Sequence, residues 1–215
     1  MIQIESFTFG PFQENTYILS NEKKECLIID PGMYELNEFD RFFAHIEKKG
    51  LKPLLLLNTH THIDHIVGNA AVKMKFKTPF AFHQLDRPVF DSAKQAAAMF
   101  NLTYVSSPEP DYYVKEGEEV EFGEDRFKIL LAPGHSPGSV CFYHEVQKFA
   151  IVGDVLFQMS IGRSDLPGGN YDTLVNSIHT QLFTLPDETE VYSGHGPATN
   201  IGFEKMNNPF VGMNR

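Results

Sequence analysis

The sequence predicts a layered α/β protein in which helices cover the outer faces of β-sheets. Two short apolar runs, residues 54–57 and 149–152, are too short for helices and are typical of strands covered on both faces. Between such runs lie amphipathic segments. In residues 35–49 the apolar side chains fall on one helical face, with charges opposite. Strands and helices of these kinds pack together as helices outside sheets.

The first half opens with strands at 16–19 and 26–29, which a polar turn at 20–25 joins as in a β-hairpin. Asp30-Pro31-Gly32 ends the second strand. The pattern then predicts a helix at 35–49, a strand at 54–57, a helix at 67–75, a strand at 79–82 and a helix at 86–100. The run Ala96-Ala97-Ala98 favours the last of these helices.

The second half repeats this alternation. We expect strands near Val120 and at 127–131, 140–143 and 149–152, then a helix at 171–183 and a strand at 190–192. The tail to Arg215 has no clear periodicity. The length of 215 residues suits one large domain, so we expect a single domain over residues 1–215.

Composition narrows the class of protein. With 42% hydrophobic residues and 13% aromatics, the chain should fold. Its net charge of −10, without a basic cluster, disfavours a nucleic-acid partner. The first residues lack a signal-peptide pattern, and no stretch approaches the roughly 20 apolar residues of a membrane span, so we expect a cytoplasmic protein with no membrane partner. Cys26 and Cys141 lie in apolar runs and are expected to be buried free thiols.

The strongest chemical signal is His60-Thr61-His62-Ile63-Asp64-His65, which places four potential metal ligands directly after a buried strand. Imidazole and carboxylate groups suit zinc, iron and manganese. The alternative is a polar helix start, with Asp64 as a cap and the histidines facing solvent. Against it, His135, Asp154 and His195 each follow a predicted strand in the same way. Strand carboxyl ends are where α/β sheets build their sites.

These residues resemble the metallo-β-lactamase superfamily. Its signature positions match, in order, Asp30, the motif from His60 to His65, His135 within Pro133-Gly134-His135-Ser136-Pro137-Gly138, Asp154 and His195. The resemblance implies a four-layer αββα sandwich and a two-metal site. It places His60, His62 and His135 on one metal and Asp64, His65 and His195 on the other, with Asp154 between them.

Within that superfamily, three segments look most like glyoxalase II, the hydroxyacylglutathione hydrolases, and particularly their short relatives. They are Gly153-Asp154, Gly162-Arg163-Ser164-Asp165 and Ser193-Gly194-His195-Gly196-Pro197. Glyoxalase II proper carries a helical C-terminal extension that contributes glutathione contacts, whereas 20 residues follow His195 here. The resemblance therefore implies a hydrolase of small acyl-thiols such as S-D-lactoylglutathione, without fixing glutathione as the thiol.

The predicted reaction needs no protein nucleophile, because two divalent cations can activate a water and polarise the scissile carbonyl. Zinc is the first expectation, with iron or manganese as alternatives. Attack by a metal-bound hydroxide would release a weakly basic thiolate. Asp64 and Asp154 are the predicted catalytic carboxylates, since their negative charge holds both cations. The oligomeric state cannot be read from one chain.

Two further residues are candidates. Asp30 is expected to orient a ligand through a hydrogen bond, although an Asp before Pro-Gly also forms turns. Arg163 could pair with a substrate carboxylate or lie in solvent. The remaining histidines, His45, His83, His144 and His179, are expected to be structural.

Other functions compete with thioester hydrolysis. A persulfide dioxygenase-like oxidoreductase with one iron would retain the same ligands and is the leading alternative. A β-lactamase is disfavoured because many enzymes with that activity carry Cys where Asp154 stands and are exported. A nuclease would need basic surface, and a noncatalytic metal-binding module would be expected to have an incomplete ligand set.

Overall fold

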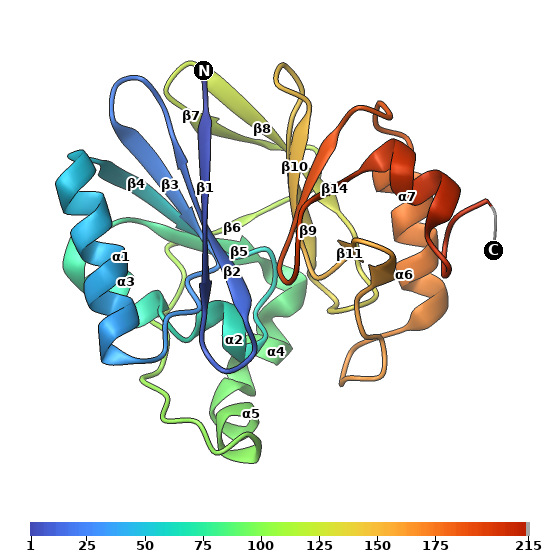
Figure 1. The fold of residues 1–215 in the computed structure, drawn as a ribbon. Helices are drawn as coiled ribbons and strands as arrows, with labels where there is room; N and C mark the ends of the chain where they lie inside the picture. Colours follow the sequence, from blue (N-terminus) through green and yellow to red (C-terminus); the bar gives the residue numbers. More distant parts are fainter. Residues whose placement is uncertain (214–215) are drawn as a thin grey trace.

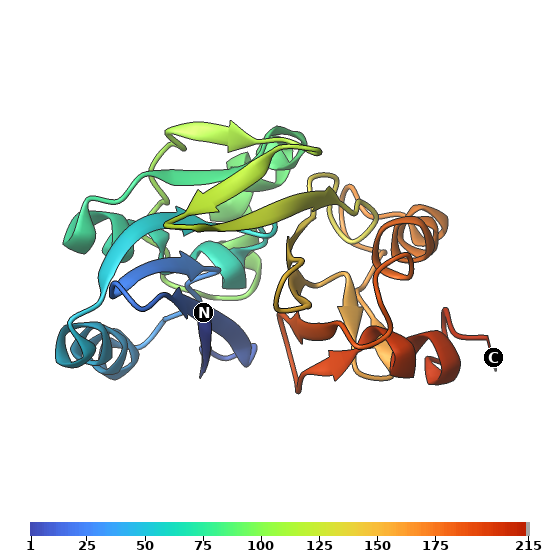
Figure 2. The same cartoon turned by 90° about the horizontal axis from the view of Figure 1, so that it is seen from above.

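Two six-stranded sheets pack face to face in the computed structural model, which describes residues 1–213 (Figure 1). The last two residues of the predicted domain, Asn214 and Arg215, lie outside the described residues. Seen from above, helices cover the outer face of each sheet (Figure 2). The predicted αββα sandwich is therefore confirmed.

The first sheet has the order β1-β2-β3-β4-β5-β6. Its strands are β1 (Gln3–Phe9), β2 (Glu14–Ser20), β3 (Glu25–Ile29), β4 (Lys52–Leu57), β5 (Phe80–His83) and β6 (Tyr112–Val114). The strands from β1 to β3 are antiparallel, as expected for the predicted hairpin, whereas β3 to β6 run parallel. The carboxyl ends of β3, β4 and β5 consequently meet at one edge.

The second sheet has the order β14-β13-β10-β9-β8-β7. Its strands are β7 (Glu119–Phe122), β8 (Asp125–Leu131), β9 (Val140–His144), β10 (Phe149–Gly153), β13 (Glu190–Ser193) and β14 (Thr199–Asn200). A separate hairpin joins β11 (Leu156–Phe157) to β12 (Ser160–Ile161). Within this sheet β10 and β13 are parallel, so both point their carboxyl ends the same way.

The helices divide between the two outer layers (Figure 1). The first sheet carries α1 (Leu36–Lys49), α2 (Ile63–Ile66), α3 (Asn69–Phe76), α4 (Arg87–Asp91) and α5 (Ala93–Met99). The second carries α6 (Tyr171–Ser177), a π-helical turn (Ile178–Leu182) and α7 (Ile201–Asn207). α1 begins with a capping box between Glu35 and Glu38 and ends at Gly50, whose φ of 65° closes the helix in the left-handed conformation.

Three apolar clusters hold these four layers together. Between the sheets lie alternate residues of the central strands, among them Leu27, Leu57 and Phe142. The other side of the same strands packs against helices: Phe42 of α1 lies in the first outer cluster and Leu174 of α6 in the second. Strands covered on both faces therefore explain the unbroken apolar runs in the sequence.

Several sequence predictions are wrong in detail. The predicted helix at 86–100 is broken into a short 3₁₀ turn (Gln84–Asp86), α4 and α5. Ser92 separates the two helices, and its hydroxyl donates to the carbonyl of Val89. The tail was expected to be irregular but forms α7, whose first turn is capped by the Asn200 side chain. β1 and β6 were not predicted.

No helix among residues 1–213 combines the length and the apolar character needed to span a membrane.

Candidate metal centre

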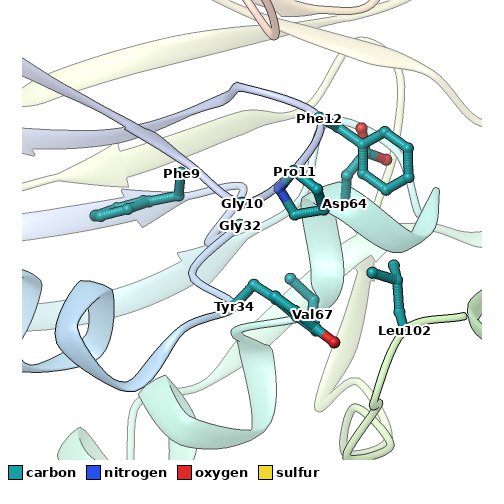
Figure 3. Close-up of a pocket in the computed structure, with 9 residues that line it drawn as sticks. All are labelled: Phe9, Gly10, Pro11, Phe12, Gly32, Tyr34, Asp64, Val67 and Leu102. Carbon is teal, nitrogen blue, oxygen red and sulfur yellow. The ribbon is translucent and has the colours of Figure 1, made fainter.

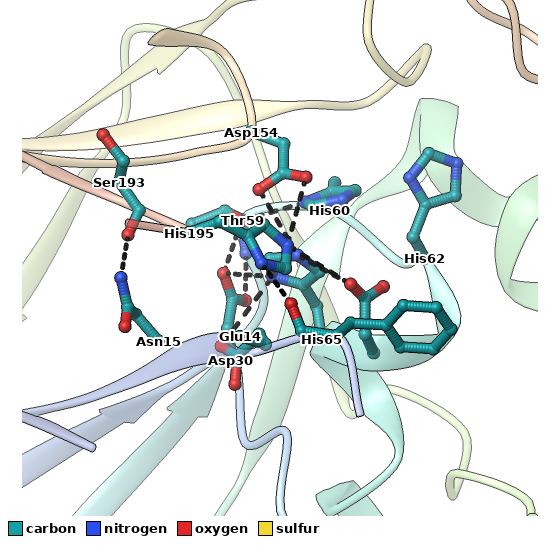
Figure 4. A network of polar contacts seen from close by, with 12 residues as sticks. Glu14, Asn15, Asp30, Thr59, His60, His62, His65, Asp154, Ser193 and His195 are labelled. Atoms are coloured by element: carbon teal, nitrogen blue, oxygen red, sulfur yellow. Dashed lines mark hydrogen bonds and ion pairs between the residues drawn. The ribbon is translucent and has the colours of Figure 1, made fainter. Parts of the chain in front are cut away.

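The predicted ligands converge at the edge where strands of both sheets end. Figure 4 shows five of them, His60, His62, His65, Asp154 and His195. The segment from His60 to His65 follows β4 and runs into α2, for which His62 occupies the N-terminal flanking position. His135 lies in the loop between β8 and β9, Asp154 directly follows β10, and His195 follows β13. The structure thus brings together all seven residues from four separate stretches of chain.

Three imidazoles face one another in the first group. Nε2 of His135 lies 3.1 Å from Nε2 of His60 and 2.9 Å from Nδ1 of His62. His60 and His135 are buried, and His62 is partly exposed. Three nitrogen donors gathered within one ion's reach, with one side open, form the ligand pattern of catalytic zinc sites.

The second group combines Asp64, His65 and His195. Nε2 of His195 lies 3.3 Å from Oδ2 of Asp64, and Nε2 of His65 lies 3.8 Å from the same oxygen. His65 is fully buried, whereas Asp64 and His195 are partly exposed. A second ion could therefore be held by two nitrogens and one oxygen.

Asp154 lies between the two groups. Its Oδ2 is 3.5 Å from Nε2 of His135 and 3.5 Å from Nε2 of His195, and its Oδ1 is 3.4 Å from Nε2 of His65. One carboxylate therefore reaches donors of both groups, which is the placement that a bridging ligand requires.

The donor atoms fit a pair of cations. Nε2 of His65 and Oδ1 of Asp154 are buried and have no hydrogen-bond partner among the described residues. Buried polar atoms are usually paired, because an unpaired one loses its hydration without compensation. Cations at this position would satisfy both atoms, so the residues present fit the metals that the family resemblance implies.

Four of the five imidazoles are held through their second nitrogen. Nδ1 of His60 lies 3.1 Å from Thr59 Oγ1, and Nδ1 of His135 lies 2.7 Å from the carbonyl oxygen of Arg163. Nδ1 of His195 lies 3.0 Å from the Phe12 carbonyl. Contacts of this kind fix the tautomer and leave Nε2 free to bind a metal.

Asp30 holds the fourth imidazole. Its Oδ2 lies 3.1 Å from Nδ1 of His65, and it also accepts from the Thr59 hydroxyl, while Oδ1 accepts from the Thr59 backbone N–H at 2.7 Å. The side chain is buried at the end of β3 with a φ of 50°. This geometry agrees with the orienting role expected for Asp30.

The electrostatic environment favours the neutral imidazoles of His60 and His62. Burial lowers the pKa of His60, and its neighbouring histidines lower it further. Burial, followed by the nearby His135, lowers the pKa of His62 to about 4. Burial alone would raise the pKa of Asp154, but His65 and the other histidines outweigh it and lower that pKa. Neutral imidazoles and an ionised carboxylate are the forms that bind metal.

The Arg163 guanidinium does not reach the ligands. It is exposed and forms an ion pair with Asp165 in its own loop, with Nε–Oδ1 and Nη2–Oδ2 distances of 2.9 and 3.0 Å. Its backbone carbonyl is the part that contacts the centre, through His135. A contact between the Arg163 side chain and a substrate stays a prediction.

Asp86 was missed as a site residue, because the sequence placed it at the start of a helix. It is buried behind the ligand loops and accepts from the Thr61 hydroxyl and the Gly138 backbone N–H, both at 2.8 Å. The sequence did offer a signal, since Asp86 follows the parallel strand β5 as the ligands follow theirs. Strand-end position could have singled it out.

The other histidines and both cysteines lie away from the ligand groups in the described part of the chain. His45 contacts Glu5, His144 contacts Asp125, His83 accepts from the Leu85 backbone and the ring of His179 lies on Phe183. Cys26 and Cys141 are free and buried, as predicted. Neither thiol can therefore serve as a nucleophile at the centre.

Comparison with known proteins agrees with this geometry. The sequence profile of the metallo-beta-lactamase superfamily matches residues 9–195. A Bacillus subtilis protein named probable metallo-hydrolase YqgX is 41% identical over 203 residues, 94% of each chain. The Haemophilus influenzae hydroxyacylglutathione hydrolase GloC is 37% identical over 212 residues, 98% of each chain.

Solved structures show the same fold. BLEG-1, described as a B3 metallo-beta-lactamase, is 37% identical with a TM-score of 0.89, over 97% of this chain and 99% of that one. TTHA1623, solved in a di-iron-bound form, is 38% identical with a TM-score of 0.86, and the match covers 96% of this chain and 99% of that one. ETHE1 from Myxococcus xanthus is 26% identical with a TM-score of 0.78, and the match covers 97% of this chain and 84% of that one.

A match over most of the chain, together with the converging ligands, defines the class of protein. The chain belongs to the metallo-β-lactamase superfamily. It is a metal-dependent hydrolase of that superfamily.

Proposed function

We propose that this protein hydrolyses thioesters of small acyl-thiols such as S-D-lactoylglutathione, with two divalent cations held by the seven converging residues. The observation that carries the proposal is the position of the Asp154 carboxylate between two separate donor groups. The relative named GloC, a hydroxyacylglutathione hydrolase that matches over 98% of both chains, supports the thioester as substrate. Zinc is the proposed metal.

When bound, the cations would lower the pKa of a water and polarise the thioester carbonyl. The chain's own residues then have two tasks. The imidazoles of the first group and the carboxylates of Asp64 and Asp154 would hold the cations. Asp30 and the Thr59 hydroxyl keep the rings of His65 and His60 in one orientation. No side chain has to protonate the departing thiolate, because a thiolate is a weakly basic leaving group.

A recess lies beside Asp64 (Figure 3). Phe12, Tyr34, Val67 and Leu102 line much of it, and its enclosed space of about 10 Å³ has room for about one water molecule. Among the described residues that line it, none is Lys or Arg. The recess therefore offers no cationic partner for the carboxylates of glutathione.

The test is a rate measurement on zinc-loaded protein with S-D-lactoylglutathione and with acyl esters of other small thiols. We expect hydrolysis that stops when the metal is chelated and when His62 is replaced by alanine. His179 is exposed, and the control variant His179→Ala should keep the wild-type rate. A β-lactam is measured beside these substrates because BLEG-1 is described as a B3 metallo-beta-lactamase. Loss of thioester turnover against every thiol, or faster turnover of the β-lactam, would overturn the substrate assignment.

A second candidate is a persulfide dioxygenase-like oxidoreductase with a single iron. Its support is that TTHA1623, which is 38% identical to this chain, was solved with iron bound, although in a di-iron form. Oxygen uptake with glutathione persulfide, together with one iron per chain, would decide for this function. The cytoplasmic location and the extent of the domain over residues 1–215 stay predictions.

A further inference from the structure

A single buried carboxylate joins the two loops that carry the first ligand group. Asp86 lies at the end of the 3₁₀ turn after β5 and is fully buried. Its Oδ2 accepts from the backbone N–H and the hydroxyl of Thr61. Its Oδ1 accepts from the backbone N–H of Gly138 and from the hydroxyl of Ser136.

Two of the three donor residues, Thr61 and Ser136, are immediate neighbours of ligands in the sequence, and Gly138 is three residues from His135. Thr61 stands between His60 and His62, and Ser136 directly follows His135. The Thr61 hydroxyl also lies 3.1 Å from the backbone carbonyl of Asp86. The loop after β4 in the first sheet is thereby fastened to the loop between β8 and β9 in the second.

We propose that Asp86 is a positioning residue that sets the geometry of the His60, His62 and His135 metal site. This inference rests on the metal centre proposed above. No part of it concerns the acyl-thiol substrate. None of the four donors to Asp86 is adjacent in sequence to His65 or His195, so the effect should be confined to one of the two metals.

Hydrogen bonding explains why a carboxylate is needed at this position. Each oxygen of Asp86 receives one backbone N–H, from Thr61 on one side and from Gly138 on the other. An amide of the same shape has only one acceptor oxygen, so its NH₂ group would face a backbone N–H in either orientation. A hydroxyl could rotate away from that group, but a backbone N–H cannot.

Close packing leaves the loops little freedom to adjust. A Cβ on Gly138 would lie 2.4 Å from the backbone nitrogen of Asp86, which is shorter than real contacts allow. Glycine at this position therefore lets the second loop approach the carboxylate. Among residues 1–213, Asp86 forms no ion pair with Lys or Arg. The four hydrogen bonds therefore offset the free-energy cost of removing its carboxylate from water.

The experiment compares zinc binding in wild-type protein and Asp86→Asn by titration of the metal-free chains against a competing chelator. We expect two zinc ions per wild-type chain. In Asp86→Asn one affinity should fall about 10- to 100-fold, which is the range for residues that orient metal ligands, and the other should stay unchanged. Zinc binding needs no substrate, so the result does not depend on whether the thioester assignment is correct.

Glu204→Gln is the matched control. Glu204 is another fully buried carboxylate, and it accepts hydrogen bonds from Met159, Thr199 and Asn208 in the layer around α7. Its amide variant should lose stability in a similar way but keep both zinc affinities. If Asp86→Asn does not fold, Ser136→Ala and Thr61→Val each remove one hydroxyl donor and should weaken the same single site.

Combination with ligand variants identifies the affected site. If Asp86 acts on the first group, adding Asp86→Asn to His62→Ala should lower the zinc affinity little further. Adding Asp86→Asn to His195→Ala should instead lower the zinc affinity by the sum of the two separate effects. Two unchanged affinities in Asp86→Asn, or an equal fall in both, would overturn the proposal. A wild-type chain that binds no zinc would overturn the metal centre and this inference with it.

Discussion

Asn15 of the first sheet donates from Nδ2 to the backbone carbonyl of Ser193 in the second sheet, over 3.1 Å (Figure 4). The same nitrogen donates to the carbonyl of Gly196 over 2.8 Å. Since His195 lies between these two carbonyls in the sequence, one amide group fixes both sides of this ligand.

Asn15→Leu should therefore weaken the second metal group. The substitution keeps the approximate shape of the side chain but removes both hydrogen bonds. The Ser193 carbonyl keeps the Tyr17 hydroxyl as a donor over 2.6 Å, and Gly196 is exposed, so each lost hydrogen bond should cost about 0.5–1.5 kcal/mol of unfolding free energy. Chemical denaturation gives this cost, and zinc titration should show one weakened affinity. Asn207→Ala is the control, because Asn207 is exposed and, within residues 1–213, its amide donates to the Phe203 carbonyl alone. Unaltered zinc binding in Asn15→Leu would contradict this role.

Gly194 leaves room for the bridging carboxylate. A Cβ at this position would lie 2.1 Å from Oδ1 of Asp154 and 2.7 Å from Cε1 of His65, so Gly194→Ala should displace ligands and lose bound metal. Gly196→Ala is a stringent comparison, since its Cβ would meet nothing within 4 Å and only its φ of 72° is unfavourable. It should cost about 1–2 kcal/mol of stability and keep both metals. Elemental analysis of both variants decides the point.

Metal should stabilise the folded chain. The buried donors of His65 and Asp154 lack hydrogen-bond partners among the described residues, and binding to the folded state alone shifts the folding equilibrium. Free zinc at about 100 times its dissociation constant should add about 2.7 kcal/mol. Thermal unfolding with zinc and with a chelator measures the shift. Equal midpoints in the two conditions would show that the centre binds no zinc.

His83 should make the protein less stable in acid. Burial lowers its pKa below the ordinary value of 6.5, so below that pH the unfolded chain takes up a proton that the folded chain resists. The contribution of His83 to stability is therefore present above pH 6.5 and is lost as the pH falls toward its lowered pKa. Chemical denaturation at pH 7.5 and 5.5 measures this contribution. Between these pH values, His83→Gln should lose less unfolding free energy than the wild type, by at most about 1.4 kcal/mol per pH unit.

Local patterns predicted a layered α/β protein with candidate ligands at the ends of strands, whereas the αββα sandwich and the two-metal site were implied by the family resemblance. Leu55, Leu56 and Leu57 are buried because β4 is covered on both faces there, although Leu54 at the start of the run is exposed. The ligand motif follows this strand. Each predicted ligand follows a strand in the same way. Strand-end placement could therefore be read without knowing how the strands are ordered.

What the sequence did not reveal depends on contacts between distant segments. The acceptors of Asp86 are filled by Thr61 and by residues 136–138, and no period or spacing along the chain encodes such a network. α7 has only seven residues, fewer than a 3.6-residue period needs to stand out. β1 is an edge strand with several exposed or half-buried positions, so it lacks the apolar run that marked the central strands.

The burial of both sulfur atoms has a chemical consequence for the proposed release of a thiol. Cys26 lies beneath the helices of one outer layer and Cys141 in the other, and burial raises the pKa of Cys26 to about 12 and that of Cys141 further. Mixed disulfides form through an accessible thiolate. If the proposed hydrolysis releases a thiol, the protein should tolerate a pool of that thiol, or of its oxidised form, without forming a mixed disulfide with it.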